Sequence, residues 1–237
     1  MRVVRGALPD VDADRRVTRR LLDRTERTDE PTLRVWRPPR QLAFGRRDSA
    51  LDGYERAREI AADRGYAPID RSAGGSAVAY TGTTVAFAIA VPVESGRGWG
   101  DIESRYRETV SDLTGALEAV GATVTRGEPD GSFCPGEHSL QGTGKVAGVA
   151  QRVRRESALV GGCVLTSKAD ERAVSRVLEP VYATLGLPFD PNAVGSVEGA
   201  GGDPDSERLV EAIEAAFVGD RETASISAAE TLGGDCP

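Results

Sequence analysis

The feature that most constrains the fold is an apolar run from Thr84 to Val93, TVAFAIAVPV. It is far shorter than the roughly 20 apolar residues that a membrane-spanning helix needs. It is also rich in β-branched residues, which favour strands over helices. The run therefore predicts a buried strand.

Helical and strand patterns alternate on both sides of this run. Apolar residues at helical spacing predict helices over 10–27, 52–64, 101–120, 170–185 and 205–217. Short β-rich segments predict strands at 32–36, 41–44, 122–125, 138–141, 145–153 and 158–165, with a longer β region over 68–93. Because hairpins join many of the strands, the pattern indicates an α+β fold with a mixed, largely antiparallel sheet packed with helices. The glycine-rich stretch 195–206 predicts an exposed loop.

Composition narrows the class of protein. A chain of 237 residues that is 39% hydrophobic can form one domain with a substantial core. Its net charge of −7 makes it a poor partner for nucleic acid, which is bound by neutralising phosphates. Three cysteines do not form a disulfide framework, and residues 1–10 lack the apolar stretch of a signal peptide. We therefore expect a cytoplasmic protein that contacts neither nucleic acid nor a membrane.

One short loop concentrates the chemically distinctive side chains. The segment GSFCPGEHSLQGTGKVAG, residues 131–148, holds Cys134, the only histidine, His138, and Lys145. Only two of the 30 basic residues are lysine, so Lys145 is a selective choice of a compact, nucleophilic cation. Pro135 and Gly136 favour a turn that would expose the Cys134 sulfur as a nucleophile. A small buried loop residue is the competing interpretation of Cys134, and the two have about equal weight.

Two glycine-rich segments need separate interpretations. The GTGKVAG segment lacks the spacing and the following Ser or Thr of a phosphate-binding loop, so it predicts a hairpin turn. In RSAGGSAV, residues 71–78, paired glycines allow a ligand or another chain segment to lie on the backbone, and Arg71 could hold an anionic group there. A bulge in a packed sheet is the alternative. No second local pair supports a metal site at Cys134 and His138.

In order along the chain, these segments resemble the biotin/lipoate A/B protein ligase superfamily. RVWRPPRQLAFGRRDS is similar to its early strand pair, RSAGGSAV to its glycine-rich acyl-binding strand, and GKVAGVAQR to its lysine loop. The resemblance covers roughly residues 30–185. It implies a single catalytic domain over 1–237 with the biotin/lipoate protein ligase fold, an acidic helical part over 186–237 and no separate accessory domain.

Within that superfamily the chain most resembles the amidotransferases that move an octanoyl group from the glycine cleavage H protein to other lipoyl domains. Their glycine, small, aromatic, Cys-Pro-Gly run is present as GSFCPG at 131–136, and Ala79 and Tyr80 replace the histidine of ATP-dependent ligases. The resemblance implies that Cys134 accepts the acyl group and that Lys145 holds the acyl carbonyl. The substrate-binding residues that it implies are Arg71, Ser72, Gly74, Gly75, Ser76, Ala77, Gly136, Gly144, Val146, Ala147 and Gly148.

The resemblance also implies the substrates. The acyl group is octanoyl or lipoyl, and the partners are lipoyl-domain proteins such as the glycine cleavage H protein and the E2 subunits of 2-oxoacid dehydrogenases. One amide replaces another of similar energy, so no cofactor is required. Residues 85–93 and 146–149 would supply an apolar tunnel for the acyl chain.

Three questions stay open on the sequence alone. An ATP-dependent lipoate-protein ligase, using ATP and Mg with an acyl-adenylate at Lys145, is the main alternative. A noncatalytic protein that binds lipoyl domains through Arg152, Arg154 and Arg155 is a further one. His138 is either a base for the incoming lysine or an exposed loop residue.

Overall fold

A computed structural model describes residues 1–71, 74–93 and 101–233, and its larger sheet has eight strands. Their order across the sheet is β11-β1-β2-β6-β10-β9-β8-β7. The pairs β11/β1 and β1/β2 are parallel, and the other pairs are antiparallel. The strand bounds are Arg2–Arg5 (β1), Thr32–Trp36 (β2), Val85–Pro92 (β6), Thr125–Arg126 (β7), Ser139–Gln141 (β8), Lys145–Val153 (β9), Ser157–Val164 (β10) and Ala224–Ser227 (β11).

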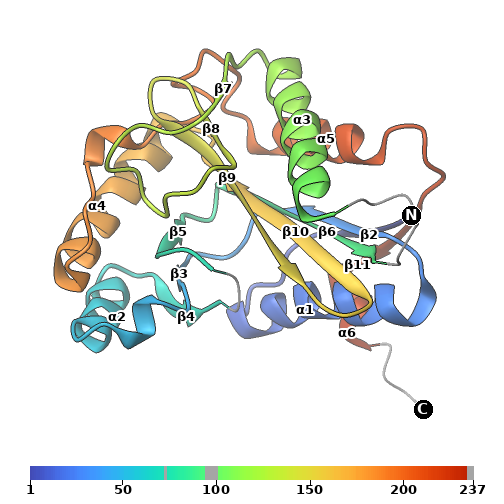
Figure 1. Ribbon diagram of the computed structural model, residues 1–237, viewed down its shortest axis with the longest axis horizontal. Coiled ribbons are helices and arrows are strands. Elements are labelled where there is room, and N and C mark those ends of the chain that lie inside the picture. The colour runs from blue at the N-terminus through green and yellow to red at the C-terminus, as the bar shows by residue number, and fades with distance from the viewer. Residues whose placement is uncertain (72–73, 94–100, 234–237) are drawn as a thin grey trace.

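A smaller sheet lies beside the larger one and has its own helices (Figure 1). Its order is β4-β3-β5, formed by Ala67–Asp70, Gln41–Phe44 and Val78–Tyr80. Helices α2 (Tyr54–Asp63) and α4 (Lys168–Leu185) pack against this sheet in a shared apolar cluster. A short 3₁₀ turn at Asp48–Ala50 precedes α2.

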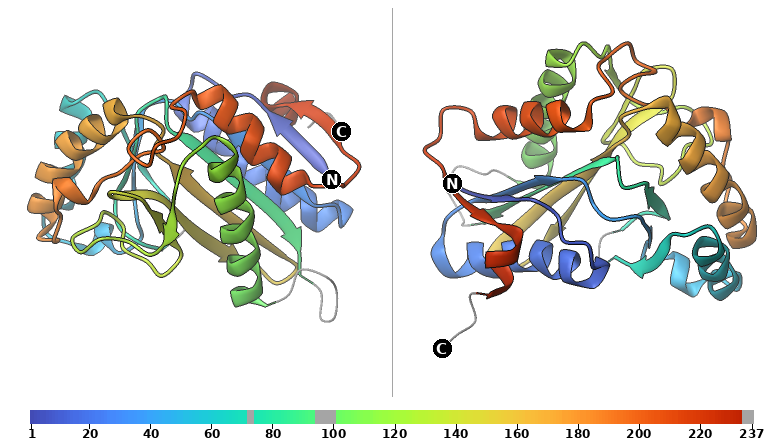
Figure 2. Two further views of the ribbon diagram at one scale, coloured as in Figure 1. Left: turned by 90° about the horizontal axis from the view of Figure 1, so that it is seen from above. Right: turned by 180° about the vertical axis from the view of Figure 1, so that it is seen from behind.

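The predicted buried strand is β6, and its two faces carry side chains of different size. Val85, Phe87, Ile89 and Val91 pack with helices α3 (Ile102–Ala119) and α5 (Ser206–Val218), where the Phe87 and Phe217 rings stack at 5.2 Å. The alanines at 86, 88 and 90 face helix α1 (Val11–Thr28) instead. Strand alternation explains this division. The α3/α5 side of β6 therefore carries large side chains and the α1 side carries alanines, and Figure 2 shows α1 on the opposite side of the large sheet from α3 and α5.

Helix starts follow local capping rules. Asp10 accepts a hydrogen bond from the Ala13 N–H at 2.7 Å, and Asp101 accepts one from the Ser104 N–H at 2.8 Å. Ser167 forms a capping box with Asp170 at the start of α4. Such caps contribute about 1 kcal/mol each. The remaining short elements are a 3₁₀ turn at Pro191–Ala193 and α6 at Ala228–Gly233.

The predicted α+β class with a mixed, largely antiparallel sheet is confirmed, and each predicted helix is present. The strands β1 and β11 were not predicted, and both pair only with segments distant in the chain. The prediction of a strand at 122–125 was wrong, since only Thr125 of this range belongs to β7.

The glycine-rich stretch 195–206 is a second correction, because its first residues are buried rather than exposed. Val197 is fully buried, and Gly195 lies against Gly144, where an added Cβ would approach backbone atoms at 2.6 Å. Val194 also forms a bridge with Lys145. Position 195 requires glycine because two backbones touch there.

Within the described ranges, none of the helices is both long and apolar enough to cross a membrane.

Candidate functional site

A cavity of about 700 Å³ lies where the two sheets and helix α1 meet. Its floor on the large sheet is made of small residues, so the sheet surface stays open. These are Ala86, Ala88, Gly148, Ala150, Gly161 and Gly162. Leu22, Trp36 and Leu159 add larger apolar walls. A volume of this size is typical of small-molecule sites.

Only part of the two segments predicted to form the apolar tunnel lines the cavity. The valines at 85, 91 and 146 do not line the cavity, because they point into the core on the α3/α5 side. From the two predicted segments, the lining residues are Ala86, Phe87, Ala88, Gly148 and Val149. Phe87 reaches the cavity although it also packs in the α3/α5 core, so strand alternation alone does not decide which residues line it.

Cys134 lies at this cavity in an unusual backbone conformation. Its φ of 43° is left-handed, which costs a non-glycine residue about 1–2 kcal/mol. Its N–H donates to the Tyr182 hydroxyl at 2.7 Å, and that hydroxyl donates to the Ala77 carbonyl at 2.9 Å. Burial raises the pKa of Tyr182, so the phenol stays protonated and keeps both contacts. The sulfur is thus held at a fixed position on a strained turn.

Arg71 provides the cation nearest to the sulfur. Its Nη2 donates to Cys134 Sγ at 3.0 Å and to the Ser76 carbonyl at 2.7 Å. Burial acts to lower the pKa of the Arg71 guanidinium, but its contacts, first among them that with Cys134, together raise it. A cation hydrogen-bonded to a cysteine sulfur favours the thiolate, the nucleophilic form.

Gly75 makes room for this pair. A Cβ at this position would lie 2.5 Å from Cys134 Sγ and 2.8 Å from Arg71 Nη2, and its φ is +88°. The sequence predicted that the paired glycines let another group approach the backbone. That group is the side chain of Cys134 together with Arg71. Gly74, by contrast, faces open space.

Lys145 lies in the same site, but it contacts backbone carbonyls rather than the sulfur. Its Nζ donates to the carbonyls of Phe133 and Cys134 at 3.0 and 2.7 Å. The third contact is an ion pair with Glu128 Oε2 at 2.6 Å. An ammonium has three N–H groups, and these three acceptors account for all of them. The role of Lys145 as an anchor for the acyl carbonyl stays a prediction.

Glu128 was missed by the sequence analysis. The same carboxylate accepts from the Ser139 hydroxyl at 2.8 Å and from the Gly136 N–H at 2.7 Å. It therefore joins Lys145 to both ends of the turn that follows Cys134. No local pattern marks Glu128, since its partners lie 8 to 17 positions later in the chain.

His138 forms part of the cavity wall and is half-buried rather than an exposed loop residue. Its ring stacks on Tyr106, with centroids 3.6 Å apart and planes at 10°. The Arg126 Nη2 lies 3.1 Å from Nδ1. Because a guanidinium only donates, Nδ1 accepts, and we assign the neutral tautomer with its proton on Nε2. Burial is the largest cause that lowers the pKa of His138, which favours this neutral form.

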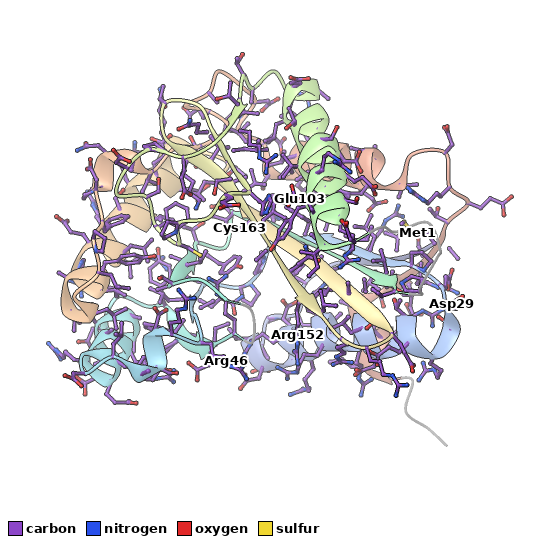
Figure 3. The ribbon with its side chains drawn as sticks, viewed as in Figure 1. Met1, Asp29, Arg46, Glu103, Arg152 and Cys163 are labelled. Carbon is purple, nitrogen blue, oxygen red and sulfur yellow. The ribbon has the colours of Figure 1, made fainter. Side chains whose placement is uncertain are left out.

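Two more cavity residues, Tyr80 and Cys163, were missed by the sequence analysis. Cys163 lies near the centre of the molecule on β10 (Figure 3). Burial raises the pKa of its thiol to about 12, so it stays uncharged at neutral pH. Burial also raises the pKa of Tyr80. Of the two thiols at the cavity, only Cys134 has a guanidinium hydrogen-bonded to its sulfur within the described residues.

The predicted substrate-binding residues divide into two groups. Those that line the cavity are Arg71, Gly74, Gly75, Gly136 and Gly148. Those outside its lining are Ser76, Ala77, Gly144, Val146 and Ala147. Ala77, Val146 and Ala147 are buried in the core, Ser76 is partly buried, and Gly144 lies against the backbone of Val194. Ser72 lies outside the described residues.

The arginines of the predicted carrier-binding face are not equivalent. Arg152 lines the cavity, whereas Arg154 forms ion pairs with Asp23 and Glu26 of helix α1 at 2.7 and 3.1 Å. Arg154 is thus tied to its own chain. In the described part of the chain, no group of three His, Cys, Asp or Glu side chains is placed to hold a metal ion.

The sequence matches a known family of catalytic domains over most of its length. Residues 13–218 match the lipoyl protein ligase A/B catalytic domain. An octanoyl-[GcvH]:protein N-octanoyltransferase of Lysinibacillus sphaericus is 29% identical over 131 residues, 55% of this chain and 46% of that protein. A lipoyl-[GcvH]:protein N-lipoyltransferase of Listeria monocytogenes is 24% identical over 176 residues, 70% of this chain and 62% of that protein. The matched part of the chain thus covers less than two thirds of the length of each of these relatives.

Solved structures with the same fold include a lipoate-protein ligase A bound with ATP. It has a TM-score of 0.73 at 17% identity, covering 98% of this chain and 94% of that one. A putative lipoate protein ligase from T. acidophilum with bound lipoic acid has a TM-score of 0.69 at 16% identity, covering 98% and 92%. These likenesses show the fold.

Proposed function

Because this chain belongs to the lipoyl protein ligase A/B catalytic-domain family, we propose that it is an acyltransferase of protein lipoylation. It moves an octanoyl or lipoyl group from an acylated carrier domain to the lysine of a lipoyl domain, through a thioester on Cys134. The observation that carries this proposal is the guanidinium of Arg71, 3.0 Å from the Cys134 sulfur at the cavity. The names of the transferase relatives support it.

In the first step the Cys134 thiolate attacks the carbonyl carbon of the acylated lysine on the carrier. A carbon–sulfur bond forms, the carbon–nitrogen bond breaks, and the lysine amine leaves after taking up a proton. Arg71 favours the thiolate before the attack. The acyl chain occupies the apolar floor formed by Ala86, Ala88 and Gly161.

In the second step the neutral amine of the acceptor lysine attacks the thioester carbonyl. The new carbon–nitrogen bond forms, the carbon–sulfur bond breaks, the amine gives up a proton, and the Cys134 thiolate returns. One amide replaces another, so the exchange is close to balanced in free energy and needs no nucleotide. The donor and acceptor are lipoyl-domain proteins, with the H protein as donor and E2 subunits among the acceptors.

The ATP-dependent ligase reaction is less well supported by the geometry. It gives no role to a cysteine sulfur beside a guanidinium. All three N–H groups of Lys145 have acceptors in the chain, so this ammonium does not distinguish the two reactions.

The test is incubation with octanoylated H protein without ATP, followed by intact-mass analysis. We expect an octanoyl adduct that disappears in Cys134→Ala and persists in Cys163→Ala, because the Cys163 thiol is uncharged at neutral pH. Acylation that requires ATP and free octanoate would instead support the ligase. Binding of the H protein without any adduct would support a noncatalytic carrier-binding protein.

A further inference from the structure

We propose that Glu128 is a positioning residue for the nucleophile, acting through Lys145 on the backbone of Cys134. The inference rests on the proposed function for its role in acyl transfer. Its evidence is the set of short contacts around one carboxylate.

Glu128 gathers three donors on two oxygens. Oε2 accepts from Lys145 Nζ at 2.6 Å and from the Ser139 hydroxyl at 2.8 Å, and Oε1 accepts from the Gly136 N–H at 2.7 Å. Charge-assisted hydrogen bonds of this length are stronger than neutral ones. The carboxylate therefore holds in place both the turn after Cys134 and the ammonium of Lys145.

Lys145 transmits this constraint to the nucleophile. Its side chain is almost fully buried, at 2% exposure, so its ammonium needs a counter-charge in place of water. Glu128 supplies that charge, and the remaining two N–H groups hold the carbonyls of Phe133 and Cys134. The carbonyl side of Cys134 is thereby fixed.

The amide side of Cys134 is fixed separately by the Tyr182 hydroxyl, at 2.7 Å. Cys134, held at both its N–H and its carbonyl, has a left-handed φ of 43°, which a non-glycine residue adopts only when its surroundings impose it. Without Glu128, the Lys145 ammonium would lose its counter-charge and the turn would lose a shared acceptor. The Cys134 backbone would then relax and carry the sulfur away from Arg71.

An amide cannot replace this carboxylate. Glutamine has one acceptor oxygen, and its NH₂ group would face one of the donors that Glu128 now accepts from. Glu128→Gln thus removes the charge and one acceptor while keeping the shape of the side chain. Asp130→Asn is the matched control, since Asp130 is an exposed acid two positions away that does not line the cavity.

The experiment measures transfer kinetics and the alkylation of Cys134 by iodoacetamide, followed by peptide mass mapping. For Glu128→Gln we expect kcat to fall about ten- to hundredfold with KM within about twofold, because the loss acts on the reacting geometry. Alkylation of Cys134 should slow in parallel, and Asp130→Asn should behave as the wild type. Wild-type kcat and alkylation in Glu128→Gln would overturn the proposal.

A double-mutant cycle tests the route through Lys145. If Glu128 acts through this ammonium, Glu128→Gln combined with Lys145→Met should be no slower than Lys145→Met alone. Additive losses would overturn that route. Should Glu128→Gln fail to fold, Glu128→Asp is the second variant, because it keeps the charge on a side chain one methylene shorter. We then expect a smaller loss of kcat and of the alkylation rate. Unchanged rates in Glu128→Asp would contradict the proposal.

Alkylation needs no acyl substrate, so the two proposals can fail separately. If the wild type transfers no acyl group but Glu128→Gln still slows alkylation of Cys134, the proposed function fails and the positioning role stands. If transfer occurs and Glu128→Gln changes neither rate, the positioning role alone fails.

Discussion

The guanidinium of Arg71 lies 3.0 Å from the sulfur of Cys134, although 63 positions separate the two residues in the chain. Arg71 directly follows β4 of the small sheet, and Cys134 lies in the connection between β7 and β8 of the large sheet. The environment of the sulfur therefore depends on how the two sheets pack together.

Replacing Arg71 by leucine should slow both acyl transfer and alkylation of Cys134 by iodoacetamide. A hydrogen bond to a charged group contributes about 1.5–3 kcal/mol, which corresponds to about a ten- to hundredfold loss in rate. Stopped-flow transfer assays and peptide mapping measure the two rates. Arg56→Leu, an exposed arginine on α2, is the control and should change neither. Unchanged alkylation in Arg71→Leu would contradict the role of Arg71.

Gly75→Ala should inactivate the site by steric overlap with both members of this pair. The new Cβ would lie 2.5 Å from Cys134 Sγ and 2.8 Å from Arg71 Nη2. Gly82→Ala is a matched control, because Gly82 also has a positive φ, +95°, but open space around it. Both variants should lose about 1–2 kcal/mol of unfolding free energy from the left-handed backbone. Only Gly75→Ala should lose transfer activity; equal activity of the two variants would refute the steric argument.

Ala88→Leu should narrow the cavity on its sheet side and make transfer depend on acyl length. Ala88 lines the cavity from β6, opposite in direction to Ile89 and its neighbours in the α3/α5 core. We expect the kcat/KM for an octanoyl donor to fall about ten- to hundredfold, and that for a butanoyl donor to change much less. Competition assays with mixed donors measure the ratio. An equal loss on both chain lengths would mean that Ala88 does not contact the acyl chain.

His138 should titrate below its ordinary pKa of about 6.5, because burial disfavours the imidazolium. As the single histidine of the chain, it gives an unambiguous Cε1–H signal in an NMR titration. In the window between the lowered folded value and 6.5, the unfolded chain binds a proton that the folded chain does not. Stability is therefore full above 6.5 and falls as the pH drops through that window.

Urea unfolding of the wild type and His138→Gln at several pH values checks the same point. The wild type should lose more unfolding free energy than the variant between neutral and mildly acidic pH. An NMR midpoint at or above 6.5 would be inconsistent with the stacked, neutral imidazole.

Most of the helices and strands could be predicted from the sequence alone. Period and capping act over a few residues, so Asp10, Asp101 and Ser167 mark helix starts without any distant contact. The β6 strand could likewise be predicted, because a short apolar run rich in β-branched residues favours few other structures. The strands β1 and β11 were not, since they are short and form only by pairing with segments far away in the chain.

The cluster of rare residues around Cys134 was also visible in the sequence, and the structure brings Cys134, Lys145 and Arg71 into one site. Which cation contacts which atom could not be predicted, because it depends on the packing of the two sheets. Hydrogen bonds of about 3 Å depend on how two sheets pack, and no local spacing encodes that packing. This packing places the Arg71 guanidinium against the sulfur of Cys134 and the Lys145 ammonium against its carbonyl. Glu128, which the sequence did not reveal, is the counter-charge of Lys145.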